Sequence, residues 1–304
     1  MNTNPWLSGA IASLLLISLS LNAAAASRVV TSIKPLELLV LAVAEEDVEV
    51  TNLVPPGSSP HTYTMKPSQR RALENADRVF WVGPQLESFL TRLLEGEELH
   101  RRTLALGPEQ ANDDEHHQEE AGRHNEAHGH ANGGTDPHVW LDPVLALEMA
   151  GRIARSLSEL PGADTARLEQ RLGQFREQLA AAESGIRKKL QPLEDISLFT
   201  YHDAFSRYAE HYGLEVDGVL TFNPGVSPGA RHMAEVQQQL RNANNPCLLT
   251  EPQFQREWWR GISSGIDITL VEWDPLAGDI TPSANGYIDF QHKIADSVLR
   301  CLQD

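Results

Sequence analysis

The chain has 304 residues, of which 42 are Asp or Glu and 25 are Lys or Arg, so its formal charge is −17. Such an acidic surface argues against nucleic-acid binding, because contacts to phosphates need Lys and Arg, and it fits an attraction for cations. The length exceeds what one hydrophobic core commonly serves and predicts two domains.

The first 26 residues predict a secretory signal peptide. They carry no charged side chain, and an apolar run from Leu7 to Leu21 leads into the small residues of "LNAAAAS". The segment before the run lacks the usual Lys or Arg. The run is shorter than the roughly 20 residues that span a bilayer, so a membrane anchor is the weaker alternative. We therefore expect export as a soluble protein.

Residues 27–160 are expected to form a first α/β lobe. Short β-branched runs alternate there with helical patterns. The expected strands are residues 28–34, 47–54 and 77–83, and the expected helices are residues 36–46, 67–76 and 84–96. This alternation predicts βαβ units and a mainly parallel sheet.

Residues 112–135 of this lobe predict a disordered loop, because they are polar, acidic and Gly-tipped, with no apolar period. Five histidines occur in this tract: His116, His117, His124, His128 and His130. A tract of this kind binds metal loosely, since the chain must be ordered around the ion. We expect an accessory zinc-collecting tract, and a solvated insert without function is the alternative.

Residues 161–193 predict a helix that links two lobes. Apolar residues recur at spacings of three and four: Leu168, Leu172, Phe175, Leu179, Ala182, Ile186 and Leu190. The pattern is typical of one amphipathic helix of about seven turns that stops near Pro192. Such a helix should hold the lobes at a nearly fixed distance, whereas a Gly/Ser linker would let them hinge widely. A coiled-coil partner helix is the weaker alternative.

Residues 194–304 repeat the same alternation and predict a second α/β lobe. The expected strands are residues 196–202, 214–220, 246–252 and 268–275, and the expected helices are residues 204–213, 228–242, 255–265 and 287–303. The only cysteines are Cys247 and Cys301. In an exported protein an even, minimal count favours one disulfide, with two buried free thiols as the alternative.

Ligands of open α/β sheets bind beyond the carboxyl ends of the strands, so we asked which side chains occur there. His61 and His138 lie in such loops of the first lobe, and His202 and Asp274 follow strands of the second. Three imidazoles and a carboxylate suit tetrahedral Zn²⁺. Each residue alone is weak evidence, because a lone loop histidine is usually an ordinary surface residue. Their shared placement predicts a zinc site.

Catalytic signatures are missing from the sequence. It contains no H-E-x-x-H, no G-x-S-x-G and no G-x-x-x-x-G-K-[ST] motif. A hydrolytic zinc would need an open position and a positioned base, for which Asp203 is the available candidate. Carboxylates beside the histidines are more simply interpreted as groups that orient the rings. We expect no enzymatic activity.

Five motifs together give the chain a family resemblance: "LVPPGSSPHTYTMKPSQ", "DPHVWLDP", "TYHDAFSRYAEHYGL", "TEPQF" and "WDPLAG". With them the chain resembles the metal-binding proteins of zinc and manganese ABC importers, and within these the zinc-uptake, ZnuA-like branch. The resemblance covers essentially the whole chain after the signal peptide. It implies two α/β lobes bridged by one long rigid helix, with the metal in the interlobe cleft.

The resemblance also implies roles for individual residues. His61, His138 and His202 match the three metal-binding histidines, and Asp274 matches a position that supplies a carboxylate in many members. The third position resembles a Glu in manganese-specific relatives, so His202 favours zinc. A water or a loop residue could replace Asp274 as fourth ligand. Cys247 and Cys301 match the disulfide positions of some members.

The function that the resemblance implies is capture of Zn²⁺ in the periplasm and delivery to an inner-membrane ABC permease with its ATPase. The expected protein is a monomer that binds no nucleic acid. His232 is expected to join the His-rich tract in an auxiliary site. The alternatives are the manganese or iron component of a related importer, a secreted zinc hydrolase, and a metal buffer or adhesin without a transporter.

Overall fold

The computed structural model describes residues 26–108, 136–221, 224–225, 228–254 and 257–302, with no account of the side chains of residues 194, 257, 258 and 260. The expected signal peptide up to residue 25 and the His-rich tract lie outside the described residues. No helix in the described part is both long enough and apolar enough to cross a membrane.

The first lobe contains a four-stranded parallel sheet in the order β2-β1-β3-β4. Its strands are β1 (Ser27–Thr31), β2 (Val48–Asn52), β3 (Arg78–Trp81) and β4 (Thr103–Ala105). Its helices are α1 (Lys34–Val43), α2 (Pro67–Glu74), α3 (Ser88–Leu94), α4 (Glu97–His100) and α5 (Pro143–Ser158), and a short 3-10 turn, η1 (Val139–Leu141), precedes α5. The parallel sheet expected for this lobe is confirmed.

Two details of the first lobe differ from the sequence-based expectation. Residues 84–96 were expected to form one helix, but α3 begins only at Ser88. The chain turns instead at Gly83 to Glu87, because the Glu87 carboxylate accepts hydrogen bonds from the backbone N–H groups of Val82 and Gly83. Strand β4 was not anticipated, since three residues are too few to show a period.

The second lobe repeats the architecture with strand order β6-β5-β7-β8, again all parallel. Its strands are β5 (Leu198–His202), β6 (Val216–Thr221), β7 (Cys247–Thr250) and β8 (Thr269–Glu272). Its helices are α7 (Ser206–Tyr212), α8 (Ala230–Asn242), α9 (Glu257–Ser263) and α10 (Gly286–Val298), with 3-10 turns η2 (Gln191–Asp195) and η3 (Leu299–Leu302). The expected α/β class is confirmed.

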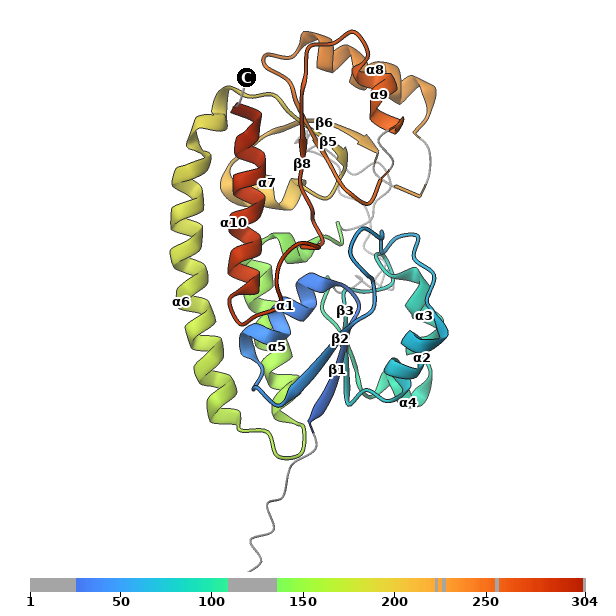
Figure 1. Ribbon diagram of the computed structural model, residues 1–304, viewed down its shortest axis with the longest axis vertical. Helices are drawn as coiled ribbons and strands as arrows, with labels where there is room; N and C mark the ends of the chain where they lie inside the picture. Colours follow the sequence, from blue (N-terminus) through green and yellow to red (C-terminus); the bar gives the residue numbers. More distant parts are fainter. Residues whose placement is uncertain (1–25, 109–135, 222–223, 226–227, 255–256, 303–304) are drawn as a thin grey trace, which may run out of the picture.

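The long helix α6 (Thr165–Leu190) runs beside both lobes, with α10 alongside it (Figure 1). The Asp164 side chain caps its first turn by accepting from the N–H of Arg167, and three basic residues complement the dipole of its last turn. Six of the seven apolar positions named above are buried, and Leu172 is partly buried. Because α6 packs against α1, α5 and α10, one hydrophobic core continues from one sheet to the other.

The two cysteines form a disulfide. Cys247 at the start of β7 is bonded to Cys301 in η3, with 5.6 Å between the Cα atoms, and both residues are buried. The bridge ties the C-terminus to a central strand of the second sheet. The disulfide favoured from the sequence is confirmed, and the alternative of two free thiols is excluded.

Candidate metal centre

Three histidine rings meet between the two sheets. The ring centroids of His61 and His138 are 5.5 Å apart, those of His61 and His202 are 5.1 Å apart, and those of His138 and His202 are 4.8 Å apart. One nitrogen from each ring can be chosen so that all three lie within 4.8 Å of one another. The Nε2 atoms of His61 and His138 are 3.4 Å apart. The structure thus brings together the three histidines predicted from strand ends.

Local sequence explains how each ring is presented. His61 lies in the loop after β2, which Gln69 of α2 holds by accepting hydrogen bonds from the Tyr63 hydroxyl and the Lys66 N–H. His202 is the last residue of β5. The third ring, His138, precedes η1 and α5. That helix starts at a fixed point because "LDP" supplies an Asp N-cap and a Pro in the first turn.

Burial favours the neutral form of two of the three rings. His138 and His202 are 4% and 3% exposed, and His61 is partly buried. Burial lowers the pKa of His202 to about 4. Burial also lowers the pKa of His61 well below its usual value, and the neighbouring His138 and His202 lower it further. Neutral imidazole is the form that binds metal, so His61 and His202 are ready to bind a cation near neutral pH.

His202 has unsatisfied polar atoms. Within the described part of the chain, neither of its ring nitrogens makes a hydrogen bond, although both are buried. Buried polar atoms without a partner are rare and need an explanation such as an ion. A metal bound by one nitrogen would supply that partner, so the donor set fits a metal ion.

His138 is oriented by Asp136. One carboxylate oxygen of Asp136, Oδ1, accepts from both Nδ1 (2.7 Å) and the backbone N–H (2.9 Å) of His138. Burial alone would raise the pKa of Asp136, but the hydrogen bond from His138 and the charges of His138 and Arg207 lower it. The carboxylate therefore holds the proton of His138 on Nδ1, which leaves the Nε2 lone pair for a metal.

Glu251 is a residue of the site to which the sequence reasoning gave no role. It is 2% exposed and places Oε1 3.5 Å from Nδ1 of His202. Burial raises the pKa of Glu251 well above its usual value. The available signal was its position directly after β7, which is equivalent to the position of His202 at the end of β5.

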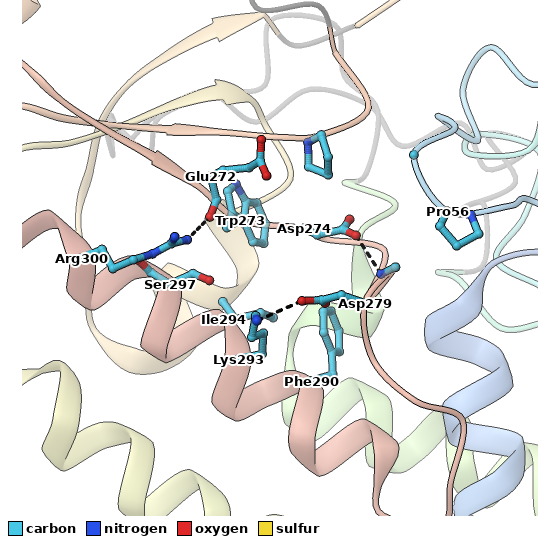
Figure 2. Close-up of a pocket in the computed structure, with 13 residues that line it drawn as sticks. Pro56, Glu272, Trp273, Asp274, Asp279, Phe290, Lys293, Ile294, Ser297 and Arg300 are labelled. Atoms are coloured by element: carbon cyan, nitrogen blue, oxygen red, sulfur yellow. Dashed lines mark hydrogen bonds and ion pairs between the residues drawn. The ribbon is translucent and has the colours of Figure 1, made fainter.

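Asp274 follows β8 and is held within its own loop. Its Oδ1 accepts from Gln253 Nε2 (2.6 Å) and from the N–H of Leu276 (2.9 Å), while Oδ2 accepts from the N–H of Gly278 (2.7 Å). Figure 2 shows Asp274 among the residues around a neighbouring hollow. This separate hollow, next to Pro56, has a volume of about 360 Å³. Among the described residues, the group whose ligand atoms all lie within 4.8 Å of one another contains the three histidines but not Asp274. Its role as fourth ligand stays a prediction.

Two further candidates lie at other places. The carboxylate of Asp203, considered above as a base, accepts a hydrogen bond from the Ser206 hydroxyl at the start of α7. His232 on α8 places Nε2 2.9 Å from the carbonyl oxygen of Val219 in β6. The five tract histidines expected to join His232 lie outside the described residues, so the auxiliary site stays a prediction.

Known proteins resemble this chain in both sequence and architecture. Residues 29–301 match the family described as zinc-uptake complex component A, periplasmic. The high-affinity zinc uptake system protein ZnuA of Yersinia pestis is 32% identical over 318 residues, covering 100% of both chains. A crystal structure of ZnuA is 25% identical, with a TM-score of 0.68, over 90% of this chain and 99% of its own.

A structure of FpvC from Pseudomonas aeruginosa in complex with Mn²⁺ is 20% identical, with a TM-score of 0.72, over 91% of this chain and 99% of its own. At that identity it shows the shared fold alone. The fold therefore also occurs in a protein bound to another ion, and the histidines must decide which ion this chain prefers.

Proposed function

Because the chain belongs to the family of the periplasmic zinc-uptake component A, we propose that it captures Zn²⁺ through His61, His138 and His202 and delivers it to an ABC permease. The observation that supports this most directly is the convergence of three largely buried imidazoles, whose ligand atoms lie within 4.8 Å. The family consists of transport proteins that bind a solute. Export by the N-terminal leader and function as a monomer in the periplasm are part of the proposal.

The chemistry of the donors favours zinc. Three neutral nitrogens suit Zn²⁺, whereas Mn²⁺ prefers carboxylate and carbonyl oxygens. His202, in the second lobe, is the residue on which this preference depends. Oδ2 of Asp274 accepts the N–H of Gly278 and keeps a second lone pair with which it could act as the fourth ligand. A water or a loop residue could take the position instead.

Capture neither makes nor breaks a covalent bond of the protein. Asp136 holds the Nδ1 proton of His138, the buried His202 offers a free nitrogen, and His61 closes the site from the loop after β2. Ligands from both lobes meet at the ion, so binding joins the lobes across the cleft. The helix α6 and the continuous core limit the movement to small adjustments.

The test is metal content and competition on the mature protein, comparing wild type with His202→Ala and with His100→Ala as control. His100 is an exposed histidine at the end of α4. We expect tight zinc binding in the wild type and the control, with Mn²⁺ competing poorly, and at least about a hundredfold weaker binding in His202→Ala. Unchanged zinc binding in His202→Ala would place the ion elsewhere.

The His-rich tract is proposed to collect zinc for the cleft, with His232 as an auxiliary residue. Deleting residues 113–134 should leave one tightly bound zinc per chain and remove the weaker equivalents. It should also slow uptake at limiting zinc. If stoichiometry and uptake both stay the same, the tract has no such role.

A further inference from the structure

A hollow lined by arginines lies on the first lobe, beside β3, β4 and α5. Its volume is about 340 Å³. We call it the arginine hollow, and the residues that line it are Arg78, Arg101, Arg102, Thr103, Leu104, Arg152, Arg155, Ser156 and Glu159. Five cations and one carboxylate thus surround one cavity in a chain whose formal charge is −17. Such a concentration of positive charge needs a physical explanation.

Three of the guanidinium groups are fixed in place by backbone carbonyls. Arg78 donates to the carbonyl oxygens of Asp77 and Ser156, and Arg102 donates to that of Ala76. Arg152 donates to the carbonyl oxygens of Ala105 and Leu106 at the end of β4. A carbonyl orients a guanidinium but carries no net charge to neutralise it. The groups are therefore preorganised and keep their positive charge.

The carboxylates near the hollow screen it only weakly. Glu159 pairs with Arg78, Glu97 with Arg101, and Glu98 with Arg102. These three glutamate side chains are 72%, 85% and 90% exposed, and ion pairs with such exposed groups contribute little. Among the residues that the structure describes, Arg152 and Arg155 form no ion pair with a carboxylate. They are three residues apart on α5 and so lie on one face of that helix.

We propose that the arginine hollow binds a phosphate-bearing molecule. Arg152 and Arg155 are its principal contacts, and Arg78 contributes a positive charge that backbone carbonyls hold in place. Guanidinium forks match the oxygens of a phosphate in pairs, which makes arginine the preferred residue for this group. The cavity is larger than one phosphate requires, and Leu104 adds apolar surface, so a phosphoester or diphosphate fits better than a halide. The phosphate belongs either to a soluble molecule or to the head group of a lipid.

The test is calorimetric titration of the metal-free, full-length mature protein with pyrophosphate at low ionic strength. Metal is removed because pyrophosphate itself chelates zinc. The variant is Arg152→Gln with Arg155→Gln. The matched control is Arg231→Gln with Arg241→Gln, which removes two exposed arginines from α8 of the other lobe. Zinc affinity, measured separately without phosphate, checks that each variant is folded.

We expect one saturable pyrophosphate site in the wild type and the control, weakened by added salt. In the Arg152/Arg155 variant the affinity should fall about tenfold or more, because charge-assisted hydrogen bonds are lost. Zinc affinity should be the same in all three proteins. The proposal is overturned if the wild type binds neither pyrophosphate nor the vesicles of phosphatidic acid described in the next paragraph. It is also overturned if the Arg152/Arg155 variant binds as tightly as the wild type. Neither conclusion depends on the zinc affinities.

Co-sedimentation with vesicles distinguishes the two sources of phosphate. Vesicles that contain phosphatidic acid are compared with vesicles of phosphatidylcholine alone. Sedimentation that needs phosphatidic acid and is lost in the variant assigns a lipid head group. Binding of pyrophosphate without sedimentation assigns a soluble phosphoester. Sedimentation that persists in the variant shows that the hollow is not the lipid contact and overturns the lipid assignment.

Discussion

Nε of Arg207, on α7, lies 2.9 Å from Oδ2 of Asp136. The other oxygen of that carboxylate, Oδ1, accepts a hydrogen bond from Nδ1 of His138. The same guanidinium donates to the backbone carbonyl of Asp136 at 3.2 Å. A cation of the second lobe thereby fixes the carboxylate that orients a histidine of the first lobe. Arg207 and Asp136 are 20% and 7% exposed at their side chains, so water screens the pair little.

Arg207 should therefore affect zinc binding without touching the ion. We expect Arg207→Gln to weaken zinc affinity by about tenfold or more, as is typical for residues that orient a ligand from behind. Arg207→Lys keeps the charge but not the fork and should recover part of the affinity. Competition with a fluorescent zinc chelator measures this, with Arg231→Gln as control. Equal affinities in Arg207→Gln and the control would contradict the role.

Ala277, in the loop after Asp274, adopts a left-handed backbone conformation with φ of 55°. That conformation costs an alanine about 1 to 2 kcal/mol, and glycine adopts it freely but loses more entropy on folding. Ala277 is also buried, so glycine loses the packing of one methyl group, which contributes about 0.8 kcal/mol. These effects nearly cancel, and we expect Ala277→Gly to change the free energy of unfolding by less than about 1 kcal/mol. Urea denaturation of the metal-free protein measures the change. The control is Ala243→Gly, at φ of −73°, where no left-handed conformation is relieved, so its free energy of unfolding should fall by more than that of Ala277→Gly.

The disulfide should contribute much of the stability of the second lobe. The bridge closes a loop with a sequence separation of 54, which restricts the unfolded chain. Replacing both cysteines by alanine should lower the free energy of unfolding by about 2 to 4 kcal/mol. The measurement compares this variant with wild type in urea under non-reducing conditions. If reductant shifts the wild-type curve as far as the double substitution does, the loss comes from the bridge and not from the altered side chains.

Glu87 should make stability depend on pH. Burial raises its pKa from 4.5 to about 7, despite hydrogen bonds from Ser32, Gly83 and Val82. The folded state therefore keeps a proton that the unfolded state loses above pH 4.5. The protonated Glu87 stabilises the folded state by about 3 kcal/mol below pH 4.5, and this contribution is lost as the pH rises towards 7.

Comparison with Glu87→Gln isolates this group, because the variant has no carboxyl to titrate at that position. The difference in unfolding free energy, wild type minus variant, should fall as the pH rises from about 4 to 8. Urea denaturation across that range provides the values. Parallel curves for the two proteins would mean that Glu87 titrates normally in the fold.

Periodicity alone was enough to predict most of the fold. Period-two and period-3.6 patterns gave the alternating strands and helices, and the apolar spacing from Leu168 to Leu190 gave α6. The prediction failed at residues 84–96, where the Glu87 carboxylate caps a turn that no periodicity records. It also missed β4, which owes its existence to pairing with β3.

The histidines could be found from the sequence because their positions follow from topology. Parallel strands place their carboxyl ends at one edge, so His61 and His202 could be assigned before any contact was known. Asp274 satisfied the same rule, yet its oxygens are directed to Gln253, Leu276 and Gly278. Strand order decides which loop a residue occupies, but it does not decide where its side chain points.

The sequence by itself determined the two α/β lobes, the helix that joins them and the three histidines, because these depend on patterns within short segments. Only the tertiary structure decided which groups surround those histidines. Arg207 and Asp136 are 71 residues apart, and Glu251 meets His202 from a neighbouring strand. The first pair depends on how the two lobes pack across α6, and the second depends on the strand order within the second sheet. Side-chain geometry of that kind is fixed by contacts between distant segments, which the patterns of short segments do not contain.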